Sequence, residues 1–165
     1  MNVCDTGRFT GVSMGAVEVA DVLGCLHDGS LETVTFGEDG WRLVISIDYL
    51  AQPLGRPGEC VVICHSGPDI EWRPWDGEGC PVQRLVDLPL HGAEVMRAQL
   101  CSEGAVALLV MLDGGSGGEL VLEADSVSVR WADGTVLSAS DVLMASETYW
   151  SGFEAKRSNE SRGED

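Results

Sequence analysis

The strongest pattern along the chain is a strict alternation of side-chain types between residues 41 and 48. One face of this run would carry Trp41, Leu43, Ile45 and Ile47. The other face would carry Arg42, Val44, Ser46 and Asp48. A period of two is typical of a β-strand with one buried face. Residues 31–36 alternate in the same way, and residues 37–40 contain two glycines, so the two runs predict a hairpin.

More short runs have the composition or the alternation of strands. They cover residues 60–64, 70–72, 84–88, 95–101, 105–112, 119–124 and 127–131. The run from Ala105 to Leu112 is apolar on both faces, which is typical of a central strand. Residues 113–118 reverse the chain before the next run, and Asp133 with Gly134 predicts another tight turn.

Helical patterns lie on either side of the strand-rich region. Residues 13–24 carry a partial apolar stripe behind Ser13, and Ser140 with Asp141 can cap a helix that runs to about Phe153. Because strands and helices do not alternate, a doubly wound parallel sheet is disfavoured. We predict a mainly β, β-rich α+β fold: an antiparallel sandwich or open barrel of about eight strands with one or two flanking helices.

The length of 165 residues fits a single domain. We place this β-rich domain at residues 1–155. Residues 156–165 are polar and contain no large apolar side chain, so we predict a disordered tail there.

The acid excess restricts function more than any other feature of the composition. The chain has 27 Asp and Glu against 10 Lys and Arg, a formal charge of −17, and residues 1–150 alone carry −16. Such a surface repels nucleic acid and anionic membranes. It attracts a basic protein and speeds the encounter, or it serves solubility alone. With no leader pattern at the start and no apolar run long enough to span a membrane, we predict a cytoplasmic protein whose six cysteines are reduced.

Motifs that suggest chemistry each lack an essential part. The glycine-rich segment 113–118 is followed by a predicted strand, whereas a phosphate-binding loop opens a helix. Cys60, Cys64 and His65 resemble half of a zinc site, but no second closely spaced cysteine pair completes it. On a strand, Cys64 and His65 point to opposite faces, so they form no dyad. We therefore predict no catalytic residue, no metal and no cofactor, and leave open an enzyme of unrecognised type.

A short segment is the predicted partner-binding site. It contains Trp72, Arg73, Trp75 and Asp76 within an acidic, loop-rich stretch. Exposed tryptophan beside arginine and acid is typical of an interaction hot spot. The alternative is that these side chains close the end of the sandwich or barrel.

Residues 26–31, with the sequence Leu-His-Asp-Gly-Ser-Leu, precede the predicted hairpin. Over residues 26–48 the chain resembles small β-rich bacterial immunity proteins of polymorphic toxin systems, which begin with a His-Asp turn and two amphipathic strands. The resemblance implies an inhibitor that binds a toxin and performs no chemistry. Considered as residues alone, His27 and Asp28 are predicted to satisfy backbone groups in a structural turn.

The leading hypothesis is a non-catalytic, acidic protein-binding module, and within that class a toxin-neutralising immunity protein with a basic toxin as its partner. One alternative is a β-barrel-like protein that binds a small ligand or acts as an unfamiliar enzyme. Another is a structural subunit that assembles with copies of itself.

Overall fold

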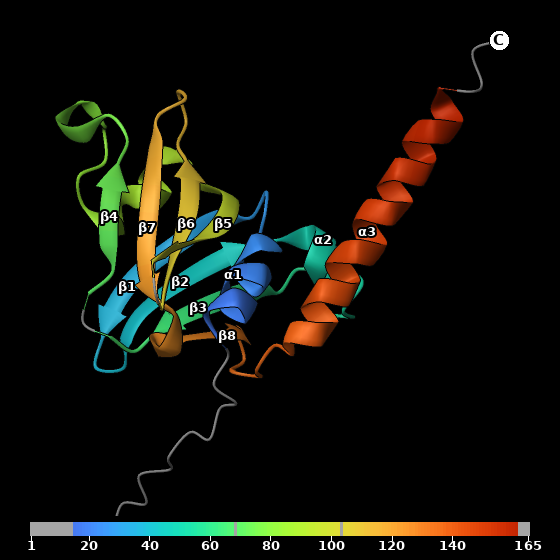
Figure 1. Ribbon diagram of the computed structural model, residues 1–165, viewed down its shortest axis with the longest axis horizontal. Helices are drawn as coiled ribbons and strands as arrows, with labels where there is room; N and C mark the ends of the chain where they lie inside the picture. The colour runs from blue at the N-terminus through green and yellow to red at the C-terminus, as the bar shows by residue number, and fades with distance from the viewer. Residues whose placement is uncertain (1–14, 68, 103, 162–165) are drawn as a thin grey trace, which may run out of the picture.

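The computed structural model describes residues 15–67, 69–102 and 104–161 (Figure 1). Within these residues the strands form one antiparallel sheet, in the order β4-β7-β6-β5-β1-β2-β3-β8. The strands are β1 (Ser30–Gly37), β2 (Gly40–Ser46), β3 (Cys60–His65), β4 (Glu71–Pro74), β5 (Glu94–Ser102), β6 (Ala105–Met111), β7 (Gly117–Glu123) and β8 (Val127–Trp131). The predicted mainly β fold of about eight strands is confirmed.

Three α-helices and three 3₁₀ segments complete the described chain. They are α1 (Ala16–Gly24), α2 (Asp48–Ala51), α3 (Ala139–Glu160), η1 (Gly77–Gly79), η2 (Leu85–His91) and η3 (Ala124–Ser126). α1 corresponds to the helix predicted at residues 13–24, although Ser13 lies outside the described residues. α3 continues past the predicted end at Phe153 and takes in residues 156–160 of the predicted tail, while residues 162–165 lie outside the described part.

The strand predicted at residues 84–88 is wrong, because η2 occupies this segment. Leu85 and Leu88, three residues apart, are both buried, and a tight helical turn places such residues on one side. Arg84 also holds the turn through hydrogen bonds from its side chain to the carboxylate of Asp87 at 2.8 and 2.9 Å. Pro89, which has no N–H, cannot donate to a strand ladder.

The sheet has two halves that enclose one apolar core. β1 and β5 pair only at Ser30 and Glu94, whereas β1-β2-β3-β8 and β4-β7-β6-β5 pair over longer registers. Fully buried side chains from both halves, such as Ile45 and Leu108, belong to the same core. α1 packs on β5 and β6 and adds Leu23 to this core.

A buried histidine connects the two halves a second time. His65 on β3 is fully buried, and its Nε2 accepts a hydrogen bond of 3.3 Å from the backbone N–H of Glu123 at the end of β7. Its Nδ1 lies 3.2 Å from the carbonyl oxygen of Gly67. A proton on Nδ1 allows both contacts to be hydrogen bonds. Because β3 and β7 are not neighbours in the sheet, this hydrogen bond joins one half of the sheet to the other through a side chain.

The alternation predicted for residues 41–48 is seen in the burial of β2. Leu43 and Ile45 are fully buried, while Arg42 is exposed. Trp131 is buried in the core, and Trp41 is partly buried and packs against the same core. Both tryptophans therefore lie on the inner side of their strands, as the period of two indicates.

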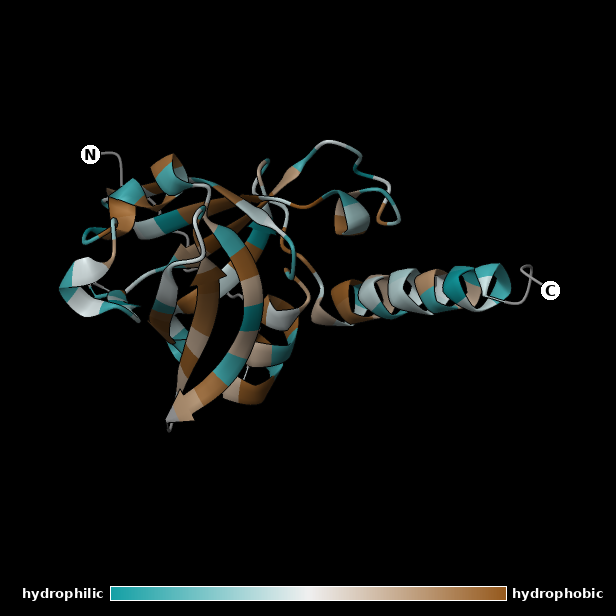
Figure 2. Cartoon of the chain, turned by 90° about the horizontal axis from the view of Figure 1, so that it is seen from above, coloured by the Kyte–Doolittle hydropathy of each residue, from teal (hydrophilic) through white to brown (hydrophobic). Residues whose placement is uncertain are grey.

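Helix α3 projects from the body of the protein (Figures 1 and 2). Its N-cap is Ser138, two residues before the predicted cap, and the Ser138 hydroxyl accepts a hydrogen bond from the N–H of Asp141. Val142 and Ala145 are buried against the body, but residues 151–160 are all exposed. Figure 2 shows the helix becoming hydrophilic toward its far end, which explains why the body does not cover that end.

Candidate functional site

The predicted partner-binding segment divides between two faces of strand β4. Trp72 packs against the core, its indole N–H donates to the carbonyl oxygen of Val82 at 3.0 Å, and its ring contacts Gly118. Arg73 lies on the exposed side and pairs with Glu71 at 2.7 Å. The structure therefore places Trp72 in a packing position and Arg73 at the surface.

Trp75 and Asp76 lie together beside the turn between β6 and β7. The Trp75 ring packs on Gly117 and is 49% exposed, and the Asp76 carboxylate accepts a hydrogen bond of 3.0 Å from the hydroxyl of Ser116. A side chain at Gly117 would meet the Trp75 ring, so the glycine-rich segment provides space for a tryptophan. Of the predicted set, Arg73, Trp75 and Asp76 are therefore exposed, while Trp72 packs against the core.

The predicted His27–Asp28 turn joins α1 to β1. Asp28 has a φ of 64°, and its backbone N–H donates to Val95 at 2.9 Å. The side chains point elsewhere: His27 Nδ1 lies 3.0 Å from Asp28 Oδ2 without the alignment of a hydrogen bond, and the His27 ring meets Trp150 of α3. The backbone thus forms the turn, and the side chains become part of a different surface.

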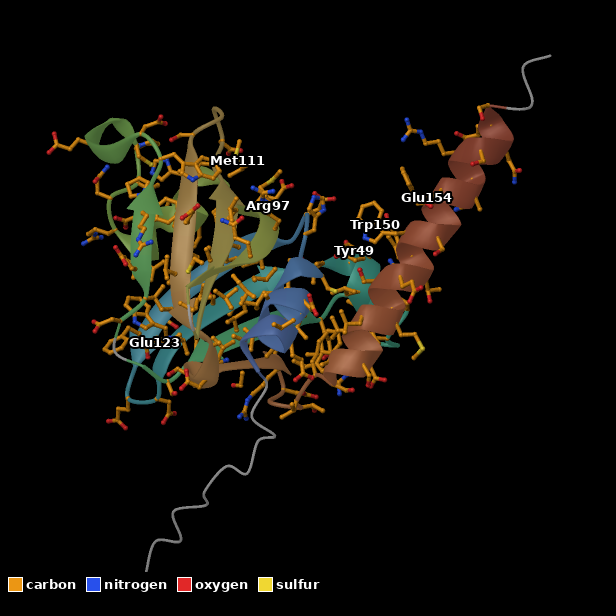
Figure 3. The ribbon with its side chains drawn as sticks, in the orientation of Figure 1. Tyr49, Arg97, Met111, Glu123, Trp150 and Glu154 are labelled. Atoms are coloured by element: carbon orange, nitrogen blue, oxygen red, sulfur yellow. The ribbon has the colours of Figure 1, made fainter. Side chains whose placement is uncertain are left out.

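That surface is an aromatic cluster where α3 leaves the body. The α3 aromatic cluster comprises His27, Tyr49, Tyr149, Trp150 and Phe153. Trp150 is central, with ring-centroid distances of 5.2 Å to Tyr149, 5.9 Å to Tyr49, and 6.0 Å to both His27 and Phe153. Figure 3 shows Trp150 reaching from α3 toward Tyr49. Tyr149 and Phe153 are 41% and 49% exposed, so the cluster is open to solvent.

Tyr49 fastens the cluster to the body of the protein. Its hydroxyl donates a hydrogen bond to the carbonyl oxygen of Cys25 at the end of α1. Burial raises the pKa of Tyr49 above its ordinary value, and the neighbouring Cys25 and Asp28 raise it further. Tyr49 therefore remains a neutral donor at physiological pH, and its ring stays in place beside α3.

The sequence contains part of the signal for this cluster. Tyr149, Trp150 and Phe153 fall on one side of the predicted helix, because residues three and four apart are neighbours on a helix surface. Nothing in the sequence indicated that Tyr49, a hundred residues earlier, would meet them. That contact depends on how α2 and α3 pack together.

A small hollow lies between Trp131 and the start of α3. Arg56 stacks over the Trp131 ring at 5.1 Å and pairs with Glu59 at 2.9 Å and Asp133 at 2.8 Å. The backbone N–H of Thr135 and the Arg56 guanidinium lower the pKa of Asp133 to about 2. The hollow is lined by Arg56, Trp131, Thr135 and the start of α3, and has a volume of about 220 Å³. Ligand pockets are typically roughly 300–1,000 Å³, so this one is small for a metabolite.

The residues that resembled a zinc half-site separate in space. Cys60 and Cys64 lie on the side of β3 away from the core, whereas His65 points inward, so the opposite orientation predicted for Cys64 and His65 is confirmed. The cysteines within the described residues carry free thiols, and Cys4 lies outside them. Among the described side chains, no three of His, Cys, Asp or Glu are grouped in a way that could hold a metal ion.

No helix in the described part of the chain is both long and apolar enough to cross a membrane. Comparison with known proteins returned no family model, no curated protein and no solved structure that matches this chain. The functional assignment therefore rests on the surface chemistry of the molecule itself.

Proposed function

We propose that this chain is a non-catalytic, acidic module that binds a basic protein. Within that class, the resemblance over residues 26–48 supports a bacterial, cytoplasmic immunity protein that neutralises a toxin. The net charge of −17 supports a basic partner, because complementary charge accelerates association and disfavours acidic competitors. Such a module acts by covering the functional surface of its partner.

The carrying observation is how few carboxylates are neutralised within the molecule. Among the described residues, arginines pair with the carboxylates of Glu59, Glu71, Asp87 and Asp133. The sequence contains 27 Asp and Glu against only 10 Lys and Arg, so most acidic side chains cannot be neutralised by the chain's own cations and remain available to an outside one. Ion pairs at the rim of an interface mainly increase the association rate, and that rate falls as salt rises.

The small-ligand alternative has less support, because the hollow beside Trp131 is only about 220 Å³. A larger hollow of about 350 Å³ lies on the exposed end of α3 between Glu154, Arg157, Ser158 and Ser161, with no apolar side chain to bury a ligand. A homo-oligomeric subunit would have to bring two strongly acidic surfaces together. Like charges across an interface oppose such association.

Affinity capture from the native host tests the proposal. We expect the purified chain to retain a basic protein at low ionic strength and to release it in high salt, because the encounter is electrostatic. An unrelated acidic protein of similar net charge is the control bait, and it should not retain the same protein. Light scattering of the chain alone completes the test. A stable homo-oligomer together with no specific basic partner at low salt would overturn the proposal in favour of the structural-subunit alternative.

The unpaired carboxylates also predict an effect of salt on stability. We expect sodium chloride to raise the melting temperature at neutral pH, because it screens repulsion between acidic side chains in the compact state. Relief of about 1 kcal/mol would raise the melting temperature of a domain of this size by about 2–4 °C. Calorimetry at several salt concentrations measures the shift, and the same series closer to the pI of about 4.3 should show a smaller one. A melting temperature that does not change with salt at neutral pH would mean that the carboxylates are individually stabilised.

A further inference from the structure

The α3 aromatic cluster is surrounded by carboxylates. Glu147 precedes Trp150 by three residues and Glu154 follows it by four, so both lie beside Trp150 on the helix surface. Figure 3 shows Glu154 one turn beyond Trp150 along the projecting helix. On the body side, Asp28 is next to His27, and its side chain is 51% exposed. A partly exposed tryptophan, with exposed aromatic neighbours at Tyr149 and Phe153, therefore lies beside three acidic residues.

The same combination of groups already holds a cation elsewhere in this molecule. At Trp131, the guanidinium of Arg56 stacks on the indole while pairing with Glu59 and Asp133. An aromatic ring face attracts a cation through its quadrupole, and neighbouring carboxylates add charge-assisted hydrogen bonds. No arginine or lysine of the described residues stacks on Trp150.

The projection of α3 makes this surface accessible to a large partner. Residues 151–160 are exposed on all sides, and Phe153, at 49% exposure, continues the apolar side of the helix past the end of the body. A second copy of the chain would bring its own Asp28, Glu147 and Glu154 against the same carboxylates, and that repulsion opposes self-association. A basic chain is the occupant whose charge is complementary.

We infer that the α3 aromatic cluster is the docking surface for an arginine-rich segment of the partner protein, with a guanidinium on Trp150 and its hydrogen bonds directed to Asp28, Glu147 and Glu154. The inference rests on the proposed function and adds to it a place and a chemistry. Arginine is favoured over lysine because its planar guanidinium can stack on an indole and pair with a carboxylate at the same time.

Calorimetric titration with a nona-arginine peptide at low ionic strength tests the inference. We expect Trp150→Ala to weaken binding about 3- to 30-fold, the range of a cation–π contact, and Phe153→Ala to weaken it less. Trp150→Phe should retain part of the affinity, since an aromatic face remains. Phe36→Ala is the matched control for Phe153→Ala: Phe36 is also an exposed phenylalanine, but it lies on β1 outside the cluster, and its removal should leave affinity unchanged. Thermal melts of each variant establish that it is folded, and Phe153→Ala, at an exposed position, keeps the test valid if Trp150→Ala unfolds.

The carboxylates are tested with two double variants of equal charge change. Glu147→Gln with Glu154→Gln should weaken peptide binding several-fold more than Glu38→Gln with Asp39→Asn in the β1–β2 turn, because only the first pair borders Trp150. A nona-lysine peptide should bind more weakly than nona-arginine. In NMR spectra, the indole signal of Trp150, assigned from Trp150→Phe, should be among those that shift on titration.

The outcomes separate the two proposals. If nona-arginine binds but the Trp150, Phe153 and Glu147/Glu154 variants match their controls, the docking surface is elsewhere and this inference fails, while the proposed function stands. If neither peptide binds at low ionic strength and affinity capture retains no basic protein, the proposed function fails with it.

Discussion

Replacement of His65 by leucine is expected to lower the free energy of unfolding by about 2–5 kcal/mol. Leucine removes both ring nitrogens of this buried side chain, so the part-buried N–H of Glu123 and carbonyl of Gly67 lose their partners, at up to roughly 1–3 kcal/mol for each group. The side-chain contact between β3 and β7 also disappears, which removes a link between the two halves of the sheet. Urea denaturation followed by tryptophan fluorescence measures the change.

The matched control for His65 is His91→Leu. His91 is only half-buried at the end of η2, and its substitution is expected to change stability by no more than about 0.5 kcal/mol. Equal stability of the two variants would show that the hydrogen bonds of His65 contribute nothing to stability. A large loss confined to the His65 variant would establish the histidine as the second connection between the halves of the sheet.

Replacement of Gly40 by alanine is the second change expected to have a large effect, about 3 kcal/mol or more. Gly40 has a φ of 97°, a conformation that costs an L-residue roughly 1–3 kcal/mol. An added Cβ would also lie 2.2 Å from the backbone carbonyl oxygen of His65, so the β1–β2 turn would have to move away from the end of β3. Overpacking of this kind adds about 1–3 kcal/mol.

Alanine substitutions at two other glycines separate the cost of the positive φ from the cost of the close contact. Gly134→Ala meets the same positive φ, 91°, but no atom lies within 4 Å of the added Cβ, so it reports the backbone conformation alone. Gly37→Ala, at the other end of the β1–β2 turn, has neither feature and should be close to neutral. Unfolding curves should therefore show Gly40→Ala as the least stable variant, Gly134→Ala as intermediate and Gly37→Ala as the most stable of the three. If Gly40→Ala were no worse than Gly134→Ala, the close approach to His65 would be relieved without cost.

Features that depend only on residues close together in the sequence could be predicted from it. The alternation at residues 41–48 predicted the buried face of β2, because successive side chains on any strand point to opposite sides. The glycines at residues 37–40 and 113–118 predicted reversals, because a tight turn needs backbone angles that glycine adopts freely. The strand predicted at residues 84–88 failed, since a short apolar run suits a 3₁₀ turn as well as a strand, and only burial of Leu85 and Leu88 on the same side decides between them.

The residues of the proposed partner surface could be predicted from the sequence only in part, for the same reason. The segment at Trp72–Asp76 has the composition of a hot spot, yet the pairing of β4 with β7 turns Trp72 toward the core and leaves Trp75 at the surface. The spacing of Tyr149, Trp150 and Phe153 places them on one side of a helix. Their neighbour Tyr49 is added by the packing of α2 against α3.

The sequence by itself determined the strand-rich class, the acid excess and the local turns of this protein, because these depend on composition and on interactions between near neighbours. Only the tertiary structure decided that two half-sheets meet at Ser30 and Glu94, that His65 reaches Glu123, and that Trp150 reaches Tyr49. Each of these contacts joins residues that lie 58 to 101 positions apart in the sequence. Periodicity records which way a side chain points, but it does not record which distant side chain it will meet.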